Sequence, residues 1–526
     1  MNGNSDFESN LMGDFFDDDL HISTIPESSL YRSIREDEVN EIEKYCNGYY
    51  RKVVVDNNFS GVTCVHLAVR HGSLKSLRYF LSLNQSFVNI RSRQGETPLF
   101  YSLRNKASSE TISLLLQYNC DVTIHDNNGY TPLHLTALDN KELSQLLIEN
   151  GADVNASNNR RGQNPLHFAT LNGNLELCRL LIENGADIKA KDNNGESPLH
   201  CAVQNSKLEI CRLLIKNGGD VNAKNNNGQM PLHYITNTGI KDIFQILILN
   251  GADVNAKDNN NESPLHFAAR STNIEFGRLL IEYGADLHAT EKNFEDTPLH
   301  YSVKHSNVEF VQFLIKNGAD INAKNKDLKT PLHYAAFYEN IEAGCFLIEN
   351  GANVNAENIY QNTPLHFCGA ISNLVLSGAL IENGADVNAK NFFTYTPLHY
   401  AAISKNVELG LMLVKKGVDV NVKTNSGETP LHAAANQFEN FEFGQFLIEN
   451  GADINAKTYD ENKTALHFVG RTKCLKFAQL LIEGGTDVNA KTKKGRTPMY
   501  YSIKNCRFID EKLEMCKLLR LNGGSL

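Results

Sequence analysis

The sequence lacks an apolar run long enough to cross a membrane, and its first 31 residues contain no Lys or Arg. Seven acidic residues fall in that stretch, so the N-terminus does not resemble a secretion signal. The net charge is −10, but after residue 31 the chain has 54 acidic and 51 basic residues. A nearly neutral chain lacks the positive surface that nucleic acid requires. We therefore expect no direct membrane insertion and no nucleic-acid partner.

Cysteine pairs and catalytic signatures are also missing. The 11 cysteines are odd in number, include no CxxC pair and often fall at helix positions, as Cys178 and Cys211 do. This pattern favours a reducing compartment, the cytoplasm or alternatively the nucleus, over disulfides or zinc. There is no GxxxxGK(S/T) phosphate loop, no HExxH, no GxSxG and no kinase signature. We expect no catalytic residue, no cofactor and no bound metal, and hence no enzyme.

What the sequence does contain is one motif repeated at a nearly fixed spacing. A Thr or its equivalent recurs every 33 to 35 residues, and 12 of the 13 prolines and 12 of the 17 histidines keep the same phase. The Thr-equivalent positions are 63, 97, 131, 164, 197, 230, 263, 297, 330, 363, 396, 429, 464 and 497. Fourteen repeats therefore tile residues 59–526. Such a period predicts a solenoid of stacked repeats rather than several separate domains.

The repeat that begins at Thr297 shows how its residues favour two helices. Thr297 can cap a helix and the proline after it suits the first turn, which predicts a first helix that runs to about His305. Apolar residues spaced three or four apart predict a second helix from near Val308. Gly318 ends this helix, because glycine adopts the left-handed conformation at little cost. The turn before the next Thr reads NNG in several repeats, which is a hairpin signal.

The ends of the chain depart from this pattern. Residues 28–58 are predicted to form a degenerate N-terminal capping repeat. Its many charged residues are typical of a terminal repeat with one face exposed to solvent. The last repeat acts as the C-terminal cap, and its Asn522-Gly523 pair comes five residues late, which predicts a longer turn between its helices. In the two earliest repeats Asn84 and Asn119 replace the helix-ending glycine, and we expect a left-handed conformation at both.

The stretches TPLHYAA at 330–336 and LLIENGADVNA at 146–156, together with the 33-residue period, resemble ankyrin repeats over nearly all of residues 59–526. The resemblance implies an all-α dominated solenoid of stacked helix-turn-helix repeats with short β-hairpin fingers. It also implies that the chain binds proteins through the hairpin tips and inner helices. Repeats of this family rarely have enzymatic activity themselves. The motif histidine, such as His333, is then similar to a framework clip that bonds the Thr hydroxyl and the backbone of neighbouring turns. Twelve histidines spaced one repeat apart cannot converge on one metal or substrate.

The fingertips lie one to four residues before the Thr-equivalent, and their character changes between the repeats of Thr297 and Thr396. Most earlier tips are polar, whereas these tips carry large apolar residues and lose the turn glycine. Clustered exposed aromatics are what an interface core needs, so we expect a partner-binding surface here. It comprises Phe294, Leu328, Phe337, Tyr338, Ile359, Tyr360, Phe392, Phe393 and Tyr395. Two alternatives stay open: neighbouring fingers pack these side chains together, or the tips have simply drifted in sequence.

The leading interpretation is a non-enzymatic interaction scaffold or adaptor that binds partner proteins along the concave face and hairpin tips. We expect a monomer, and the sequence does not identify its partners. The alternative is a regulator, inhibitor or targeting subunit in which the acidic tail, residues 1–27, supplies a separate interaction or activation function. That tail mixes acidic and large apolar residues, as interaction segments do, but a solvated tail has the same composition.

Overall fold

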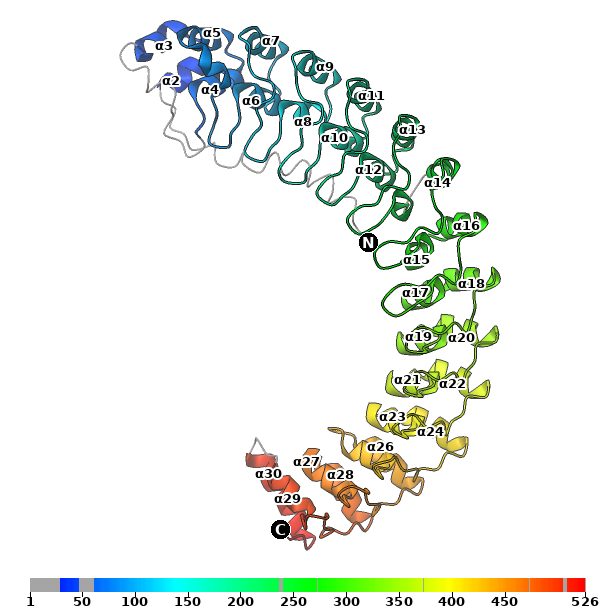
Figure 1. Ribbon diagram of the computed structural model, residues 1–526. Coiled ribbons are helices and arrows are strands. Elements are labelled where there is room, and N and C mark those ends of the chain that lie inside the picture. The colour runs from blue at the N-terminus through cyan, green and yellow to red at the C-terminus, as the bar shows by residue number, and fades with distance from the viewer. Residues whose placement is uncertain are drawn as a thin grey trace. The chain divides into compact units, whose positions relative to one another are not determined.

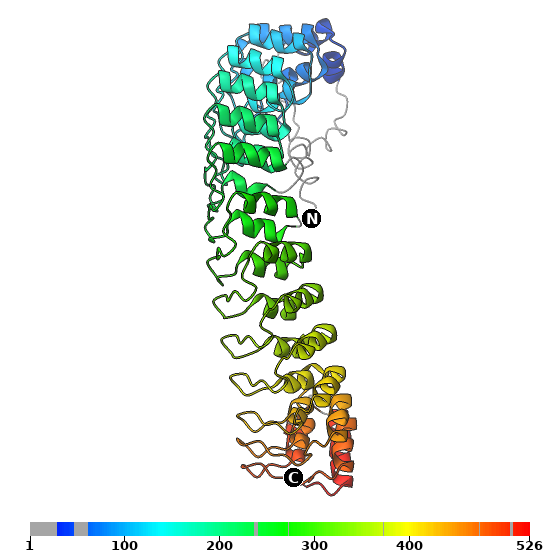
Figure 2. The ribbon, with the colours of Figure 1, turned by 90° about the vertical axis from the view of Figure 1, so that its right-hand side faces the viewer.

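The computed structural model describes residues 29–46, 61–235, 240–271, 273–371, 373–472, 474–504 and 509–525. The predicted acidic tail and residues 28 and 47–58 of the predicted N-terminal cap lie outside these ranges. The chain divides into two compact units, Met1–Asp253 and Val254–Leu526. Each unit is a row of helix pairs from which turns project on one side as fingers (Figures 1 and 2).

Each repeat of the first unit contributes a first helix and a second helix. The first helices are α2 (Ser29–Arg35), α4 (Cys64–His71), α6 (Pro98–Arg104), α8 (Pro132–Thr136), α10 (Pro165–Asn172), α12 (Pro198–Gln204) and the 3₁₀ helix η3 (Pro231–Tyr234). The second helices are α3 (Val39–Cys46), α5 (Leu74–Leu83), α7 (Ser109–Gln117), α9 (Lys141–Glu149), α11 (Leu175–Glu183), α13 (Leu208–Lys216) and α14 (Ile240–Leu249). A further 3₁₀ helix, η2 (Gln85–Asn89), follows α5.

The second unit repeats the same plan. Its first helices are α15 (Pro264–Arg270), α17 (Pro298–Lys304), α19 (Pro331–Phe337), α21 (Pro364–Ile371), α23 (Pro397–Ser404), α25 (Pro430–Ala435), α27 (Ala465–Thr472) and α29 (Pro498–Lys504). Its second helices are α16 (Ile274–Glu282), α18 (Val308–Lys316), α20 (Ile341–Glu349), α22 (Leu374–Glu382), α24 (Val407–Lys415), α26 (Phe441–Glu449), α28 (Leu475–Glu483) and α30 (Ile509–Leu521). The helical solenoid predicted from the sequence is confirmed.

These helices are too short to be stable alone in water, so their stability comes from stacking. Within each unit the first helices pack on first helices of the neighbouring repeats and the second helices pack on second helices. Leu299 of α17 and Leu314 of α18 are almost fully buried in this stack. Gly318 has φ 94°, which confirms the left-handed end of the second helix.

One local prediction is wrong. Asn119 is left-handed, with φ 58°, but Asn84 is extended, with φ −156°. The reason is η2: the Asn84 side chain accepts the N–H of Ser86 at 2.9 Å and caps this 3₁₀ helix, so the chain continues in a new helix at that point. In the last repeat, α30 has 13 residues where α18 has nine, and the predicted longer turn before α30, residues 505–508, lies outside the described residues.

The described part of the predicted N-terminal cap is the helix pair α2 and α3, which packs on α4 and α5. Tyr31 Oη lies 3.1 Å from Nε2 of His71, and the Asp37 carboxylate accepts the N–H and hydroxyl of Ser76, both at 2.7 Å. These bonds link the pair to the next repeat.

The fingers are tight turns, and the described residues contain no β-strand. A typical finger closes with two hydrogen bonds, from Asp192 N–H to Glu196 O at 2.9 Å and from Gly195 N–H to Asp192 O at 2.8 Å. The predicted hairpin is therefore present only as a short turn. Among the described residues, no helix is both long enough and apolar enough to cross a membrane.

Candidate functional site

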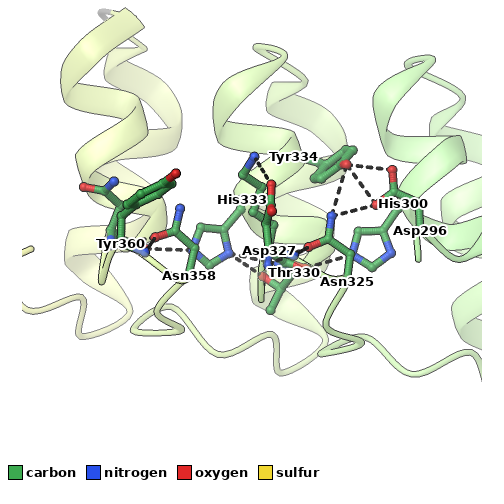
Figure 3. Close-up of polar contacts among 11 residues, drawn as sticks. Asp296, His300, Asn325, Asp327, Thr330, His333, Tyr334, Asn358 and Tyr360 are labelled. Carbon is green, nitrogen blue, oxygen red and sulfur yellow. Dashed lines mark hydrogen bonds and ion pairs between the residues drawn. The ribbon is translucent and has the colours of Figure 1, made fainter. Parts of the chain in front are cut away.

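The finger of the Thr330 repeat is held by one side chain at its base. Asn325 Oδ1 accepts the N–H of Asp327 at 3.0 Å and that of Lys329 at 2.9 Å, and the Asn325 N–H donates to Lys329 O at 3.0 Å (Figure 3). Leu328 lies at the tip of this turn with φ 56°. A side chain that satisfies two backbone donors fixes the shape of the turn, so the tip projects from a rigid base.

Where the motif histidine is present, as in the Thr330 repeat, it joins its finger to the next repeat. His333 Nδ1 accepts the N–H of Thr330 at 3.0 Å and lies 2.9 Å from the Thr330 hydroxyl oxygen, while Nε2 lies 3.0 Å from Asn362 O. A carbonyl can only accept, so Nε2 carries the proton and the ring is neutral. Burial lowers the pKa of His333 from 6.5 to about 4. The predicted framework clip is confirmed.

A second link between repeats involves the tyrosine that follows the histidine. Tyr334 Oη donates to the carboxylate of Asp296 in the preceding finger, with oxygen–oxygen distances of 2.6 and 2.8 Å, and Asn325 Nδ2 donates to the same carboxylate at 2.8 Å (Figure 3). Tyr301 and Glu262 form the corresponding pair one repeat earlier, at 2.5 Å. These buried or half-buried pairs hold neighbouring fingers in register, and burial raises the pKa of both hydroxyls.

The recurrent Asp and Asn of the loop after the second helix also have structural partners. Asp320 Oδ1 accepts the N–H of Asn322 at 2.9 Å, and Asn322 Oδ1 accepts the N–H of Asn353 at 2.7 Å. These bonds stabilise the turns in which the two residues lie. They join consecutive loops rather than converge on a reactive centre.

The predicted tip residues lie side by side because the backbones of consecutive fingers are hydrogen-bonded. Lys326 N–H donates to Phe294 O at 2.7 Å, Ile359 N–H to Asp327 O at 2.9 Å, and Phe392 N–H to Tyr360 O at 2.9 Å. The exposed members of this row are Phe294, Leu328, Ile359, Tyr360, Phe392 and Phe393, which we call the aromatic fingertips. The exposed fraction is 62% for Phe392 and 53% for Tyr360, so large apolar surface faces solvent.

The same four fingers keep a left-handed residue at the position where most other fingers have glycine, although Asn261 and Asn462 also replace it. Glu295, Leu328, Gln361 and Thr394 have φ values of 56° to 60°. This conformation costs a non-glycine residue roughly 1–2 kcal/mol, and a branched side chain such as that of Thr394 suits it poorly. Stability alone would therefore favour glycine at these positions. Backbone strain of this kind is frequent at binding surfaces.

Phe337 and Tyr338 form a separate group at the far end of the first helix. Helix α19 begins at the finger and spans seven residues, or on the order of 10 Å, before it reaches Phe337. The Phe337 ring centroid lies 5.0 Å from that of Tyr338 and 6.0 Å from that of Phe367 on α21. The sequence prediction did not include Phe367, which occupies the position four residues after Thr363, where the neighbouring repeats have Tyr334 and Tyr400.

Tyr395 differs from the other predicted residues. It is only half-exposed, its hydroxyl donates to Glu428 Oε2 at 2.8 Å, and its ring centroid lies 5.3 Å from that of His399. Tyr395 thus links two repeats beneath the tips. Within the tips, Phe392 and Phe393 contact each other edge to face with centroids 5.3 Å apart, yet both are more than half exposed. Packing between tips therefore leaves most of this apolar surface open.

The described residues contain no group of three His, Cys, Asp or Glu side chains that could hold a metal ion. The buried thiols are poor nucleophiles, because burial raises the pKa of Cys178, Cys211 and Cys368 to about 12. The absence of a cofactor, of a metal and of catalysis remains a prediction. The arrangement offers a fixed row of apolar side chains and suits recognition of another surface.

A family model matches the repeats along most of the chain. The family described as "Ankyrin repeats (3 copies)" matches residues 37–126, 65–158, 108–192, 136–225, 199–291, 265–358, 323–391, 365–458 and 439–525. Among solved structures, the human ASB11 ankyrin repeat domain covers 44% of this chain and 100% of its own length, with 21% sequence identity and a TM-score of 0.39.

Curated relatives match only part of the chain. The target of rapamycin complex 2 subunit AVO2 of Saccharomyces cerevisiae is 36% identical over 77 residues, which are 15% of this chain and 18% of that protein. The human transient receptor potential cation channel subfamily A member 1 is 31% identical over 127 residues, 23% of this chain and 11% of that protein. The match therefore spans less than a fifth of each relative.

Proposed function

Because this chain belongs to the ankyrin-repeat family, whose repeats generally act as protein-interaction modules, we propose that it is a non-enzymatic scaffold or adaptor for partner proteins. The aromatic fingertips are the site of binding that we favour, with Phe337, Tyr338 and Tyr395 as further contacts along the fingers and first helices. The observation that carries this proposal is the row of exposed Phe, Tyr, Ile and Leu side chains on four consecutive fingers.

Physical chemistry favours a protein as the ligand of this row. Aromatic side chains that become fully desolvated contribute most of the binding energy at protein interfaces. The hydrogen-bonded turns hold these side chains on rigid bases, which reduces the entropy lost when a partner binds. Phe294, Tyr360, Phe392 and Phe393 are each more than half exposed, so replacing them should change the stability of the array little.

The test is affinity capture from an extract of the native cell, with the retained proteins identified by mass spectrometry. The test variant changes Phe294, Tyr360, Phe392 and Phe393 to Ser. We expect it to lose a partner that the parent chain retains, since each hot-spot side chain contributes about 2 kcal/mol or more. Tyr395 stays unchanged in this variant because its bond to Glu428 links two repeats.

The matched control carries the same number of substitutions on fingers with polar tips. It changes Asn128, Asn194, Asn227 and Asn260 to Ser, all exposed and all three residues before the Thr-equivalent. We expect this control to retain the partner, and both variants to unfold at the denaturant concentration of the parent. If the fingertip variant keeps every partner, the proposed location is wrong. Early unfolding of that variant would mean that the aromatics serve the packing of the fingers instead.

A further inference from the structure

The finger before Thr497 is strongly basic in a chain that is acidic as a whole, because residues 491–496 contain four basic residues and no acidic one. Residues 457–504 contain ten basic and four acidic residues, whereas the net charge of the chain is −10. Five of these cations belong to the fingers before Thr464 and Thr497 and to the end of α29. We call them the basic patch: Lys463, Lys493, Lys494, Arg496 and Lys504.

The cations of the basic patch are held in place by contacts within the array. The Arg496 guanidinium lies 4.7 Å from the ring centroid of Tyr500, and Lys463 Nζ lies 5.3 Å from that of Tyr501. Lys493 Nζ donates to Tyr459 O at 2.6 Å. Cation–ring contacts restrict long side chains that would otherwise move freely, so less entropy is lost when a ligand binds them.

Nearby carboxylates neutralise only part of this charge. Glu461 lies 2.6 Å from Lys463 Nζ and 3.6 Å from Lys494 Nζ, and Asp460 on the same finger is exposed. Five cations therefore face two carboxylates, and Lys493, Lys494 and Lys504 are exposed to solvent. A local excess of positive charge attracts negatively charged ligands to this part of the surface, even though the protein as a whole is acidic.

The surroundings of the patch favour an acidic peptide over a nucleic acid. Single-stranded nucleic acid needs open aromatic faces on which bases stack. The rings of Tyr500 and Tyr501 instead contact Arg496, Lys504 and Lys463. Tyr459 beside the patch is 55% exposed, but Lys423 Nζ lies 5.4 Å from its ring centroid, so only part of the ring is open to an apolar contact. We propose that these two fingers bind an acidic peptide segment of a partner protein, with a large apolar side chain of that segment placed against Tyr459.

This proposal adds a second surface to the aromatic fingertips and is tested without them. The probe is a fluorescein-labelled peptide of about twelve residues, rich in Glu and Asp with two Phe, and its binding to the full chain is followed by fluorescence anisotropy. We expect binding that weakens as salt is added, because exposed charge pairs are screened. The variant Lys493→Glu, Lys494→Glu, Arg496→Glu should lose at least tenfold in affinity.

Matched controls separate this site from general charge effects and from the fingertips. The variant Lys189→Glu, Lys216→Glu, Lys224→Glu makes the same change in net charge on exposed residues of the first unit and should bind the peptide as the parent does. The fingertip variant should also bind it normally. Loss of binding in either control, or a Gln-substituted peptide that binds equally well, would overturn the proposal.

Two other anionic probes distinguish the class of ligand. An oligothymidylate of the same length and vesicles containing phosphatidylserine should bind the full chain more weakly than the acidic peptide at equal salt. If the oligonucleotide or the vesicles bind more tightly, or if peptide binding survives the triple charge reversal in a folded variant, the basic patch is not a site for an acidic peptide.

Discussion

Lowering the pH from 7 towards 4 is expected to reduce the stability of the array steeply, because its buried histidines are neutral when folded. Burial is the largest cause of a pKa near 4, well below the usual 6.5, at eight of the motif histidines. They are His66, His134, His200, His266, His333, His366, His399 and His432.

The direction of this change in stability follows from the number of protons that each state binds. Between pH 6.5 and 4 these histidines are protonated in the unfolded chain and neutral in the folded one, so the unfolded state binds more protons and is favoured as the pH falls. Their stabilising contribution is complete above pH 6.5 and lost towards pH 4, with up to about 3 kcal/mol for each histidine. Glu196 and Asp126 act in the opposite direction, because burial raises the pKa of both carboxyl groups.

The measurement is the urea concentration at half-unfolding, determined from pH 7.5 to 4.5. A matched variant, His333→Phe, places at this position the residue type that the second repeat has naturally in Phe100. It should be less stable at pH 7 by about 1–3 kcal/mol, since Thr330 and Asn362 lose a hydrogen-bond partner. It should also depend less steeply on pH. A midpoint independent of pH between 6.5 and 4.5 would contradict the assignment of neutral, buried histidines.

The second large effect is expected at Gly444, in the interior of a second helix. Gly444 lies in α26, and a Cβ at this position would overlap the ring of Phe477, which belongs to α28 of the next repeat and is fully buried. Gly277 and Phe310 make the corresponding pair between α16 and α18. Glycine is less favourable than alanine inside a helix, but here it leaves room for an aromatic ring of the neighbouring repeat to pack against the helix backbone.

Gly444→Ala should lower the unfolding free energy by about 1–3 kcal/mol, the usual range for overpacking a core. The control is Gly378→Ala in α22, where a Cβ would meet only the terminal carbon of Met412, at 3.3 Å. That substitution should be neutral or stabilise the array by up to about 1 kcal/mol, because alanine favours helices. Urea unfolding of both variants measures the difference, and equal stabilisation by the two alanines would contradict the packing described for Gly444.

The helices whose ends are set by nearby residues could be predicted from the sequence. The helix predicted from Thr297 to about His305 is α17, and the one predicted from near Val308 begins at that residue. Caps and left-handed glycines act within one or two turns, so their signals are present in a short stretch of sequence. The conformation of Asn84 was missed because it depends on η2, a helix outside the repeat pattern.

The contacts around the proposed site could be predicted only in part, because contacts between repeats are not visible in the sequence of a single repeat. The fixed phase placed the aromatic fingertips correctly at the tips of the turns. It could not show that the Tyr395 hydroxyl bonds to Glu428 one repeat later, or that Phe367 joins Phe337. It also could not show that Gly444 receives the ring of Phe477, since the two lie on different helices.

Amide hydrogen exchange of the chain, alone and bound to its captured partner, tests most directly whether the aromatic fingertips are the binding surface. We expect slower exchange on binding in the four neighbouring fingers, at residues 291–296, 325–330, 358–363 and 391–396. The polar-tipped fingers at 192–197 and 225–230 serve as internal controls and should exchange as in the free chain. Slower exchange confined to the second helices, or to the first unit, would contradict the proposed surface.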